Sequence, residues 1–313
     1  VPAALNSVSY RNEVWGVPWY TDLGILYYRK DLLEQHGYNY PPTTWSDLST
    51  MAQTVQKATF IKHGYLFQGG NYEGGVANAC EFIWNAGGQV LMGDLSITSD
   101  EAQMPLMMIN SQEAITGIEA ARQLVASNIA PAETYNLKEA ETAAAFRNGD
   151  ALFMRSWPTA YRQVLAEGSP LQMKDVGVAA LPVSSRENRS YSCLGGWNLM
   201  ISALADEQKQ AAAWTFIQFL TDEAQQRTLA ELGGNLPALR HLYDDSELVA
   251  SVPAIGLAKQ VMPNARLRPV TPHYMELAPD IAWAFSETLR DNLSAVAAVE
   301  SIEGLFQNAL AAQ

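Results

Sequence analysis

Short apolar segments that alternate with longer segments of helical periodicity constrain the fold of this chain more than any other feature. Residues 151–155, ALFMR, are typical of a buried strand, whereas residues 44–58 repeat apolar side chains at helical spacing behind a Thr44/Asp47 capping box. Strands separated by helices of ten or more residues predict an α/β protein with at least one mostly parallel sheet. The length of 313 residues allows two compact units or one large one.

The same signals divide the rest of the chain into elements. Residues 14–28, VWGVPWYTDLGILYY, predict two strands that meet at a Thr-Asp-Leu-Gly break. Further strands are expected over residues 64–67, 151–155, 176–180 and 198–202. Helices are expected over residues 30–36, 44–58, 77–86, 137–147 and 206–232, after Ser111, after SWPTAY, and at the carboxyl end along an apolar stripe from Val296 to Leu310.

Charge and cysteine content exclude several classes of function. Twenty Lys and Arg against 33 Asp and Glu give a net charge of −13, which repels phosphate groups and argues against a nucleic-acid or anionic-membrane partner. The two cysteines, Cys80 and Cys193, are too few for a disulfide framework or a four-cysteine zinc site, and we expect two free, buried thiols, although pairing stays open. No run of 18 apolar residues predicts a membrane span, and the first residues lack the pattern of a signal peptide.

Motifs for cofactor, metal and nucleophile chemistry are absent from the sequence. It contains no GxGxxG, no GxxxxGK[ST] and no GxSxG. The four histidines, His36, His63, His241 and His273, have no spacing that would place two on one helical face. We therefore expect no cofactor and no metal site.

Aromatic residues beside Gly or Pro in expected loops point to a different chemistry. A sugar site needs flat rings against the CH face of a pyranose, with carboxylates, amides and guanidinium groups for the hydroxyls. The candidate rings are Trp15, Trp19, Tyr20, Tyr72, Trp157 and Trp197, and the candidate polar groups are Asp22, Gln68, Glu73, Arg266 and Arg268. Taken alone, each of them is better explained as a core ring, a turn residue or a solvated surface charge.

Five segments in one order provide a further signal: GVPWYTDLGILYYRKDLLEQHGY, NYEGG, GDALFMRSWPTAY, LGGWNLMISA and ARLRPVTPHYMELAPDI. With these segments the chain resembles the extracellular solute-binding proteins (family 1) of carbohydrate ABC transporters, and most closely their trehalose/maltose-binding branch. The resemblance runs from about Ser9 to the end of the chain. It implies a periplasmic-binding-protein-like α/β fold of type II, in which two lobes close over a sugar.

The resemblance implies ligand-binding roles for single residues. The WYTD segment places Tyr20 against a sugar ring and Asp22 as an acceptor of hydroxyl hydrogen bonds, both at the first crossing between the lobes. The RSWP segment makes Trp157 a stacking plate.

Two further segments and one loop supply the remaining candidates. The GGW segment offers the backbone of Gly196 and the ring of Trp197 at another crossing, and the ARLRP segment offers Arg268, or with less support Arg266, as a fork of donors. Candidates of second rank are Tyr72, Glu73 and Gln68.

Compared with the family, the chain is expected to lack the strand-helix-strand region that opens the first lobe, roughly a hundred residues or about one small domain. The resemblance then implies a largely complete C-terminal lobe, residues 22–191 and 256–313, and a partial N-terminal lobe with the crossings, residues 1–21 and 192–255. Helices of the partial lobe should carry apolar side chains that are exposed or contact a partner, for which self-association is one route. These side chains are Trp214, Ile217, Phe219, Leu220, Leu229 and Leu232.

Three functions follow from these patterns. The first is a non-enzymatic receptor that binds a di- or oligosaccharide and delivers it to a membrane permease, in the extracytoplasmic location that the resemblance implies, either periplasmic or lipid-anchored. A glycoside hydrolase with Asp22 and Glu73 as its carboxylate pair is the alternative, because aromatic rings beside two carboxylates also serve hydrolases. The third is a truncated relative that binds no sugar and acts as an interaction module.

Overall fold

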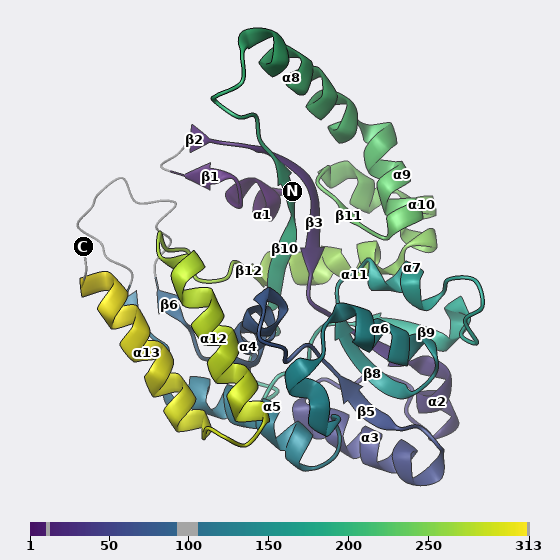
Figure 1. Ribbon diagram of the computed structural model, residues 1–313. Helices are drawn as coiled ribbons and strands as arrows, with labels where there is room; N and C mark the ends of the chain where they lie inside the picture. Colours follow the sequence, from purple (N-terminus) through teal and green to yellow (C-terminus); the bar gives the residue numbers. More distant parts are fainter. Residues whose placement is uncertain (11–12, 93–105, 312–313) are drawn as a thin grey trace.

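Two four-stranded sheets, one above the other, organise the molecule (Figure 1). The structure is a computed structural model and describes residues 1–10, 13–92 and 106–311. The lower half is the sheet β5-β8-β4-β9 with α2 to α7, α12 and α13, and the upper half is the sheet β11-β3-β10-β12 with α1 and α8 to α11.

The bounds of the elements are as follows. The strands are β1 (Ser9–Tyr10), β2 (Glu13–Val14), β3 (Val17–Leu23), β4 (Ile25–Arg29), β5 (His63–Leu66), β6 (Leu91–Met92), β7 (Leu106–Met107), β8 (Ala151–Ser156), β9 (Val176–Ala179), β10 (Ser192–Leu199), β11 (Leu236–Pro237) and β12 (Ala265–Arg266). The α-helices are α1 (Pro2–Asn6), α2 (Lys30–Gln35), α3 (Trp45–Ala58), α4 (Glu73–Asn85), α5 (Gln112–Ala126), α6 (Glu139–Arg147), α7 (Ala160–Val164), α8 (Glu207–Thr221), α9 (Glu223–Gly233), α10 (Ser246–Ser251), α11 (Pro253–Val261), α12 (Tyr274–Leu289) and α13 (Ala295–Ala311). Short 3-10 helices span Ala132–Asn136, Met173–Asp175, Arg240–Asp244 and Met262–Asn264.

The sheets are mixed, so the prediction of a mostly parallel sheet is wrong. In the lower half β5 and β8 are parallel, but β4 runs antiparallel to both β8 and β9. In the upper half β3 is antiparallel to β10 and β11, and β12 is parallel to β10. Helices between strands indicate a layered α/β fold, but they do not set the direction of strands that enter from the other half of the molecule.

Strand β10 also differs from the prediction. A strand was expected over residues 198–202, whereas β10 is Ser192–Leu199 and includes the Gly195-Gly196 pair. The glycines favoured a loop in the sequence, yet they pair with β3 at Asp22 and Thr21. The rings of Trp19, Tyr20 and Trp197 accordingly lie on strands and not in loops.

The chain crosses from the upper sheet to the lower one at Gly24, between β3 and β4. Its backbone N–H donates to the carbonyl oxygen of Cys193 at 3.3 Å. A Cβ atom at this position would lie 1.8 Å from Oε1 of Glu81, so a side chain here would displace the buried Glu81 carboxylate. The predicted joint between two strands is therefore confirmed, with glycine required at its centre.

Most predicted helices are confirmed within a few residues. Helix α3 begins behind Thr44, whose hydroxyl accepts the N–H of Asp47 at 3.0 Å while the Asp47 carboxylate accepts the N–H of Thr44 at 3.2 Å. Helix α4 begins at Glu73, one turn earlier than expected. No described helix is both long and apolar enough to cross a membrane.

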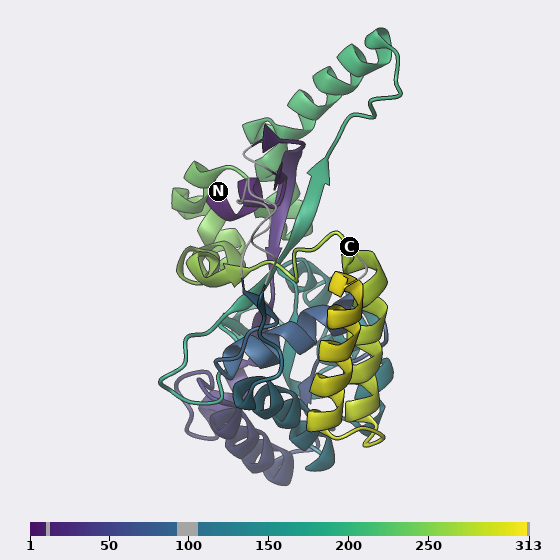
Figure 2. The ribbon, with the colours of Figure 1, turned by 90° about the vertical axis from the view of Figure 1, so that its left-hand side faces the viewer.

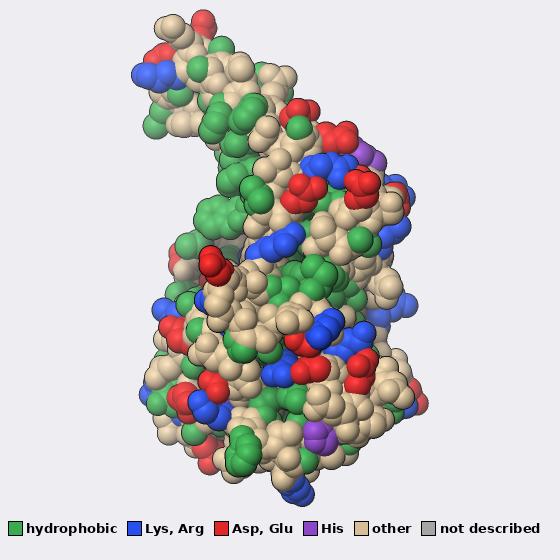
Figure 3. Space-filling model, turned by 90° about the vertical axis from the view of Figure 1, so that its right-hand side faces the viewer, with side chains coloured by type: hydrophobic (Ala, Val, Ile, Leu, Met, Phe, Trp, Pro, Cys, Tyr) green, Lys and Arg blue, Asp and Glu red, His purple; other side chains and the backbone are tan. Residues whose placement is uncertain are grey.

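The two halves differ in how much of their apolar surface is covered. In the lower half, α12 and α13 lie side by side against α5 and α4 (Figure 2) and close a core that includes Phe67, Phe82 and Phe285. In the upper half, α8 projects away from the body, and Trp214 and Phe219 are 48% and 55% exposed. Hydrophobic side chains are visible along the left edge of the upper half in Figure 3.

Exposure of the predicted apolar side chains on α8 and α9 is thus confirmed for three of the six. Leu232 is exposed as well, whereas Ile217 is buried. Leu220 and Leu229 are half-buried.

Candidate functional site

Strands β3 and β10 bring three predicted site residues, Tyr20, Asp22 and Trp197, to one face at the crossing between the halves, together with Gly195. Gly195 pairs with Asp22 and Trp197 with Tyr20 in an antiparallel register. Residues two apart on a strand share a face, and paired residues lie side by side on it. Tyr20, Asp22, Gly195 and Trp197 therefore form one continuous strip. Trp197, at the outer end of this strip, is 66% exposed.

The two glycines of β10 allow close approach from both sides. A Cβ on Gly195 would lie 3.1 Å from Cβ of Asp22 and 3.1 Å from Cζ3 of Trp157, so Trp157 packs directly against the strand where Asp22 lies. Gly196 has φ of +112°, and a Cβ there would lie 2.3 Å from the carbonyl oxygen of Tyr20. Its place in the fold already requires glycine, and a ligand contact through its backbone stays a prediction.

Asp22 is the most unusual group of the strip. It is 9% exposed, and its Oδ1 receives no hydrogen bond from the described residues. Burial raises the pKa of Asp22 to about 7, against the opposing attraction of the Arg155 guanidinium. Burial, and next the charge of Asp22, also raise the pKa of Tyr20 to about 12. A buried acceptor without a donor is costly, and a donor on a bound molecule would offset that cost.

Trp157 is held at its indole edge and on one face. It follows β8 directly, and its Nε1–H donates to Oε1 of Glu139 at 3.0 Å. The guanidinium of Arg155 lies 4.0 Å from the ring centroid. Arg155 is fully buried and forms a two-point ion pair with Glu81, at 2.8 Å for both Nε and Nη2.

Glu73 and Arg268 form a polar cluster at the start of α4. The Nε of Arg268 lies 2.7 Å from Oε1 of Glu73, which also accepts the hydroxyl of Tyr274. The Nη1 of Arg268 donates to Sγ of Cys193 at 3.6 Å. Next to Glu73, Tyr72 donates its hydroxyl to Oε2 of Glu139 at 2.5 Å. Glu139 thus connects Tyr72, the neighbour of Glu73 in the chain, to Trp157.

The two cysteines are buried, free thiols, as expected from the sequence. Burial raises the pKa of the Cys193 thiol to about 11 and that of Cys80 well above its ordinary value.

The side chains of Gln68 and Arg266 contact residues outside the strip and outside the Glu73/Arg268 cluster. Gln68 is fully buried, and its amide donates to Thr142 at 2.8 Å and to the carbonyl oxygen of Arg155 at 2.9 Å. The guanidinium of Arg266 lies 3.5 Å from the ring centroid of Tyr191. Arg266 also borders a cavity of about 360 Å³ whose lining includes neither Asp22 nor Trp157. Gln68 therefore lies in the layer beneath the strip, and Arg266 borders a cavity that is also lined by Arg268 of the polar cluster and by Leu194 of β10.

Residues that the sequence reasoning missed hold the predicted ones in place: Glu139, Arg155, Glu81 and Tyr274. Glu139 stands at the start of α6, where acidic residues are common for reasons of helix polarity alone. Arg155 lies within the otherwise apolar strand β8. A charged residue in such a strand is the one feature of the sequence that could have predicted a buried ion pair. Within the described residues no group of His, Cys, Asp and Glu could hold a metal ion.

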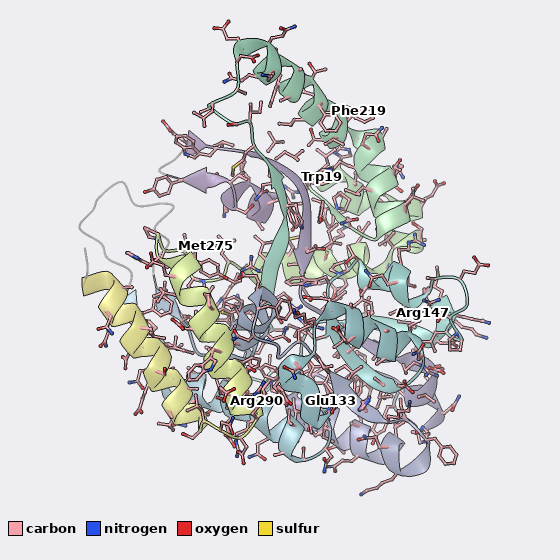
Figure 4. The ribbon with its side chains drawn as sticks, viewed as in Figure 1. Trp19, Glu133, Arg147, Phe219, Met275 and Arg290 are labelled. Atoms are coloured by element: carbon pink, nitrogen blue, oxygen red, sulfur yellow. The ribbon has the colours of Figure 1, made fainter. Side chains whose placement is uncertain are left out.

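Trp19 lies beside this strip without joining its polar cluster. Figure 4 shows Trp19 next to β3 on the side of α9, well above Met275 at the upper end of α12. Its carbonyl oxygen accepts from Gln226 of α9, and its ring meets that of Tyr20 edge to face at 5.3 Å between centroids. Trp19 therefore supports Tyr20 from the upper half.

Comparison with known proteins identifies the family of this fold and site. The model of the bacterial extracellular solute-binding proteins matches residues 1–256. The chain belongs to this family. A probable ABC transporter-binding protein of Deinococcus radiodurans is 33% identical over 310 residues, which are 97% of this chain and 70% of that relative.

Solved structures agree with the family and define the fold. Maltose-bound MalE3 of T. maritima is similar with a TM-score of 0.88 and 33% identity, over 99% of this chain and 76% of that one. A solute-binding protein of Thermotoga lettingae, bound with α-D-tagatose, has a TM-score of 0.84 at 22% identity, over 98% of this chain and 75% of that one. The fold is the periplasmic-binding-protein fold of type II, as the sequence predicted. The family is extracytoplasmic.

Proposed function

We propose that this chain is the sugar-binding component of an ABC transporter and that the crossing of β3 and β10 holds its ligand. The observation that carries the proposal is the buried Asp22 carboxylate, whose Oδ1 has no donor among the described residues and which lies beside the ring of Trp157. A hydroxyl-bearing ring fits this pairing of an acceptor and an aromatic plate.

Each predicted residue has a role in this proposal. Arg155 covers one face of the Trp157 indole, and in this proposal a sugar ring stacks on the opposite face. Asp22 accepts hydroxyl hydrogen bonds, and Tyr20 and Trp197 extend the strip for a second ring. Arg268 and Glu73 supply a donor fork and an acceptor, with their mutual ion pair rearranging around hydroxyls. Tyr72 borders the same side through Glu139.

Closure of two lobes would complete the site. We assign residues 22–191 and 256–313 to one lobe and residues 1–21 and 192–255 to the other. The boundaries then fall within β3, at the start of β10 and within α11, and β12 of the upper sheet is assigned to the first lobe. A ligand that contacts both lobes favours the closed form by the difference in its contacts to the two forms. Binding would therefore be coupled to a hinge motion at the crossing.

The proposed ligand class is a di- or oligosaccharide. The relative of known structure at 33% identity holds maltose, which makes α-linked glucose the first choice. The proposed partner is the membrane permease of the transporter. The proposed location is the periplasm or, with a lipid anchor, the outer face of the cell membrane.

No catalysis is part of the proposal. A hydrolase would need Asp22 and Glu73 as a carboxylate pair, whereas Glu73 is bound by Arg268 and Tyr274. The family and the relatives are binding proteins. Release of reducing ends from maltose or maltodextrin by the purified chain would revive the hydrolase alternative.

Isothermal titration with maltose, trehalose, sucrose and a longer maltodextrin tests the proposal. We expect saturable binding of at least one sugar, and we expect Trp157→Ala to weaken it by at least about thirtyfold, as loss of a central aromatic contact does. Trp214→Ala is the matched control, because Trp214 lies on α8 and is 48% exposed. Flat titrations with every sugar would contradict the proposal. An equal loss of sugar affinity in Trp157→Ala and Trp214→Ala would mean that Trp157 does not contact the sugar.

We also propose self-association through the exposed side of α8. The support is its apolar surface, where Phe216 and Phe219 are 59% and 55% exposed. Sedimentation velocity over a range of concentrations tests it, and a strictly monomeric profile would contradict it.

A further inference from the structure

One carboxylate holds both aromatic residues at the lower edge of the site. Oε1 of Glu139 accepts the indole N–H of Trp157 at 3.0 Å, and Oε2 accepts the hydroxyl of Tyr72 at 2.5 Å. The three residues come from separate places in the chain: the first turn of α6, the segment after β8, and the residue before α4. The Tyr72 hydroxyl oxygen also accepts the backbone N–H of Glu139, whereas the hydrogen bond described for the Trp157 indole N–H is the one to the Glu139 carboxylate.

A cation lies over each of the two rings. The Arg155 guanidinium is 4.0 Å from the centroid of Trp157, and the Lys138 ammonium is 5.2 Å from the centroid of Tyr72. Arg155 is itself fixed by Glu81, whose Oε1 also accepts the backbone N–H of Cys193 in β10 at 2.9 Å. Each ring is thus held at its polar edge by Glu139, and one of its faces is occupied by a cation. The orientation of the remaining faces is determined by the protein before any ligand arrives.

We propose that Glu139 is a positioning residue that sets the angle between the rings of Trp157 and Tyr72 and thereby the affinity for a sugar. This inference rests on the proposed function. Glu139 acts through the two rings, because each of its oxygens is already bound to one of them. A carboxylate suits this role better than an amide, since both of its oxygens accept, and hydrogen bonds to a charged acceptor are the stronger ones.

The ionisation of Tyr72 agrees with this arrangement. Burial and the hydrogen bond to Glu139 raise the pKa of the Tyr72 phenol well above its ordinary value, so the hydroxyl remains a donor. An aromatic wall that is already oriented loses less rotational freedom on binding, which is the general origin of affinity through preorganisation.

The first test needs no ligand. In a ¹H–¹⁵N spectrum the Trp157 indole resonance is assigned by its loss in Trp157→Phe. We expect Glu139→Ala to shift this resonance upfield, toward that of an indole hydrogen-bonded to water, and Glu139→Gln to restore most of its position because the amide oxygen still accepts. Glu141→Gln is the matched control, since it removes the same charge from the same helical turn, and Gln retains the capping-box geometry at this position. An unmoved indole resonance in Glu139→Ala would overturn the inference.

The second test measures sugar affinity in the same variants. We expect Glu139→Ala to weaken binding about tenfold or more, Glu139→Gln to weaken it less, and Glu141→Gln to leave it unchanged. The double variant Glu139→Ala/Tyr72→Phe should lose less than the product of the two single losses, because both changes break one contact. Losses that multiply would mean that Glu139 and the Tyr72 hydroxyl act independently, and would overturn the inference that Glu139 acts through Tyr72. Thermal midpoints of all variants show whether a loss is one of folding.

The outcomes separate this inference from the proposed function. If the unaltered chain binds no sugar, the proposed function fails, and the indole shift still decides whether Glu139 orients Trp157. If the unaltered chain binds and Glu139→Ala binds equally well, the proposed function stands and the positioning role is wrong.

Discussion

Helices α3 and α8 both begin behind a capping side chain, but α3 is packed into the core whereas α8 is largely exposed to solvent. They have 14 and 15 residues. The residue before each helix caps it: the Thr44 side chain accepts the N–H of Asp47 in α3, and the Asp206 side chain accepts the N–H of Lys209 in α8. In the lower half the apolar side of α3 is buried, with Trp45, Leu48 and Val55 in the core. In the upper half the apolar side chains of α8 are mostly exposed. Capping and propensity therefore account for the existence of a helix, and tertiary partners account for its burial.

The largest expected difference between the halves is the loss of stability when an aromatic side chain is removed from a helix. Phe82 is 2% exposed and stacks on Trp45 with 4.6 Å between ring centroids, whereas Phe219 on α8 is 55% exposed. We expect Phe82→Ala to lower the free energy of unfolding by about 3–5 kcal/mol. Phe219→Ala should change it by about 0.5 kcal/mol or less at protein concentrations low enough to keep the chain monomeric. Urea unfolding followed by circular dichroism measures both.

A large loss in Phe219→Ala would break the comparison. It would mean that the exposed side of α8 is covered in solution, and the loss should then depend on protein concentration. A loss independent of concentration would place the contact within one chain.

The crossing between the halves should give the stability a particular pH dependence. Burial raises the pKa of Asp22 to about 7 from 3.8, with Arg155 opposing and with Tyr20, Tyr27 and Tyr243 around it. Because the folded-state pKa is above the unfolded-state pKa, the folded state binds the proton more tightly. Its contribution to stability is therefore fully present below about pH 4 and is lost as the pH rises through about 7.

The variant Asp22→Asn isolates this contribution. At about 1.36 kcal/mol per pKa unit, the contribution is at most roughly 4 kcal/mol. The stability of the variant relative to the unaltered chain should rise between about pH 3 and about pH 8, the range that brackets the pKa values of 3.8 and about 7. Urea titrations of both proteins across this range measure the difference, and two parallel pH profiles would show that Asp22 is not buried as described.

The comparison also explains which features of the fold could be predicted from the sequence. The helix behind Thr44 and the strand joint at Gly24 were correct because a capping box and a Gly break are local signals. The direction of β4 was not predictable, since it depends on strands more than a hundred residues away, in β8 and β9. The strand β10 was predicted too late in the chain because the Gly195-Gly196 pair indicates a loop locally. Only the pairing of β10 with β3 explains the two glycines.

The candidate site divides in the same way. Tyr20, Asp22 and Trp157 could be named from the resemblance, and the strand register and Gly195 bring them together. Glu139 could not be predicted, because its role depends on contacts to residues 67 positions before it and 18 positions after it. An acidic residue at the start of a helix does not indicate which distant residues it will contact.

The smallest expected difference concerns the two caps themselves. Thr44→Ala removes the hydrogen bond to the N–H of Asp47, and we expect it to lower the free energy of unfolding by about 1 kcal/mol. The cost should appear in global unfolding, because α3 is packed into the core and cannot fray alone.

Asp206→Ala removes the equivalent bond to the N–H of Lys209 on a helix with few buried contacts. Its effect should be local, with faster hydrogen exchange in the first turns of α8 and an unchanged urea midpoint. Exchange followed by mass spectrometry, with both variants in parallel, checks this. A shift of the urea midpoint in Asp206→Ala equal to that in Thr44→Ala would mean that α8 unfolds together with the lower half, and that its exposed surface conceals a cooperative contact with the rest of the molecule.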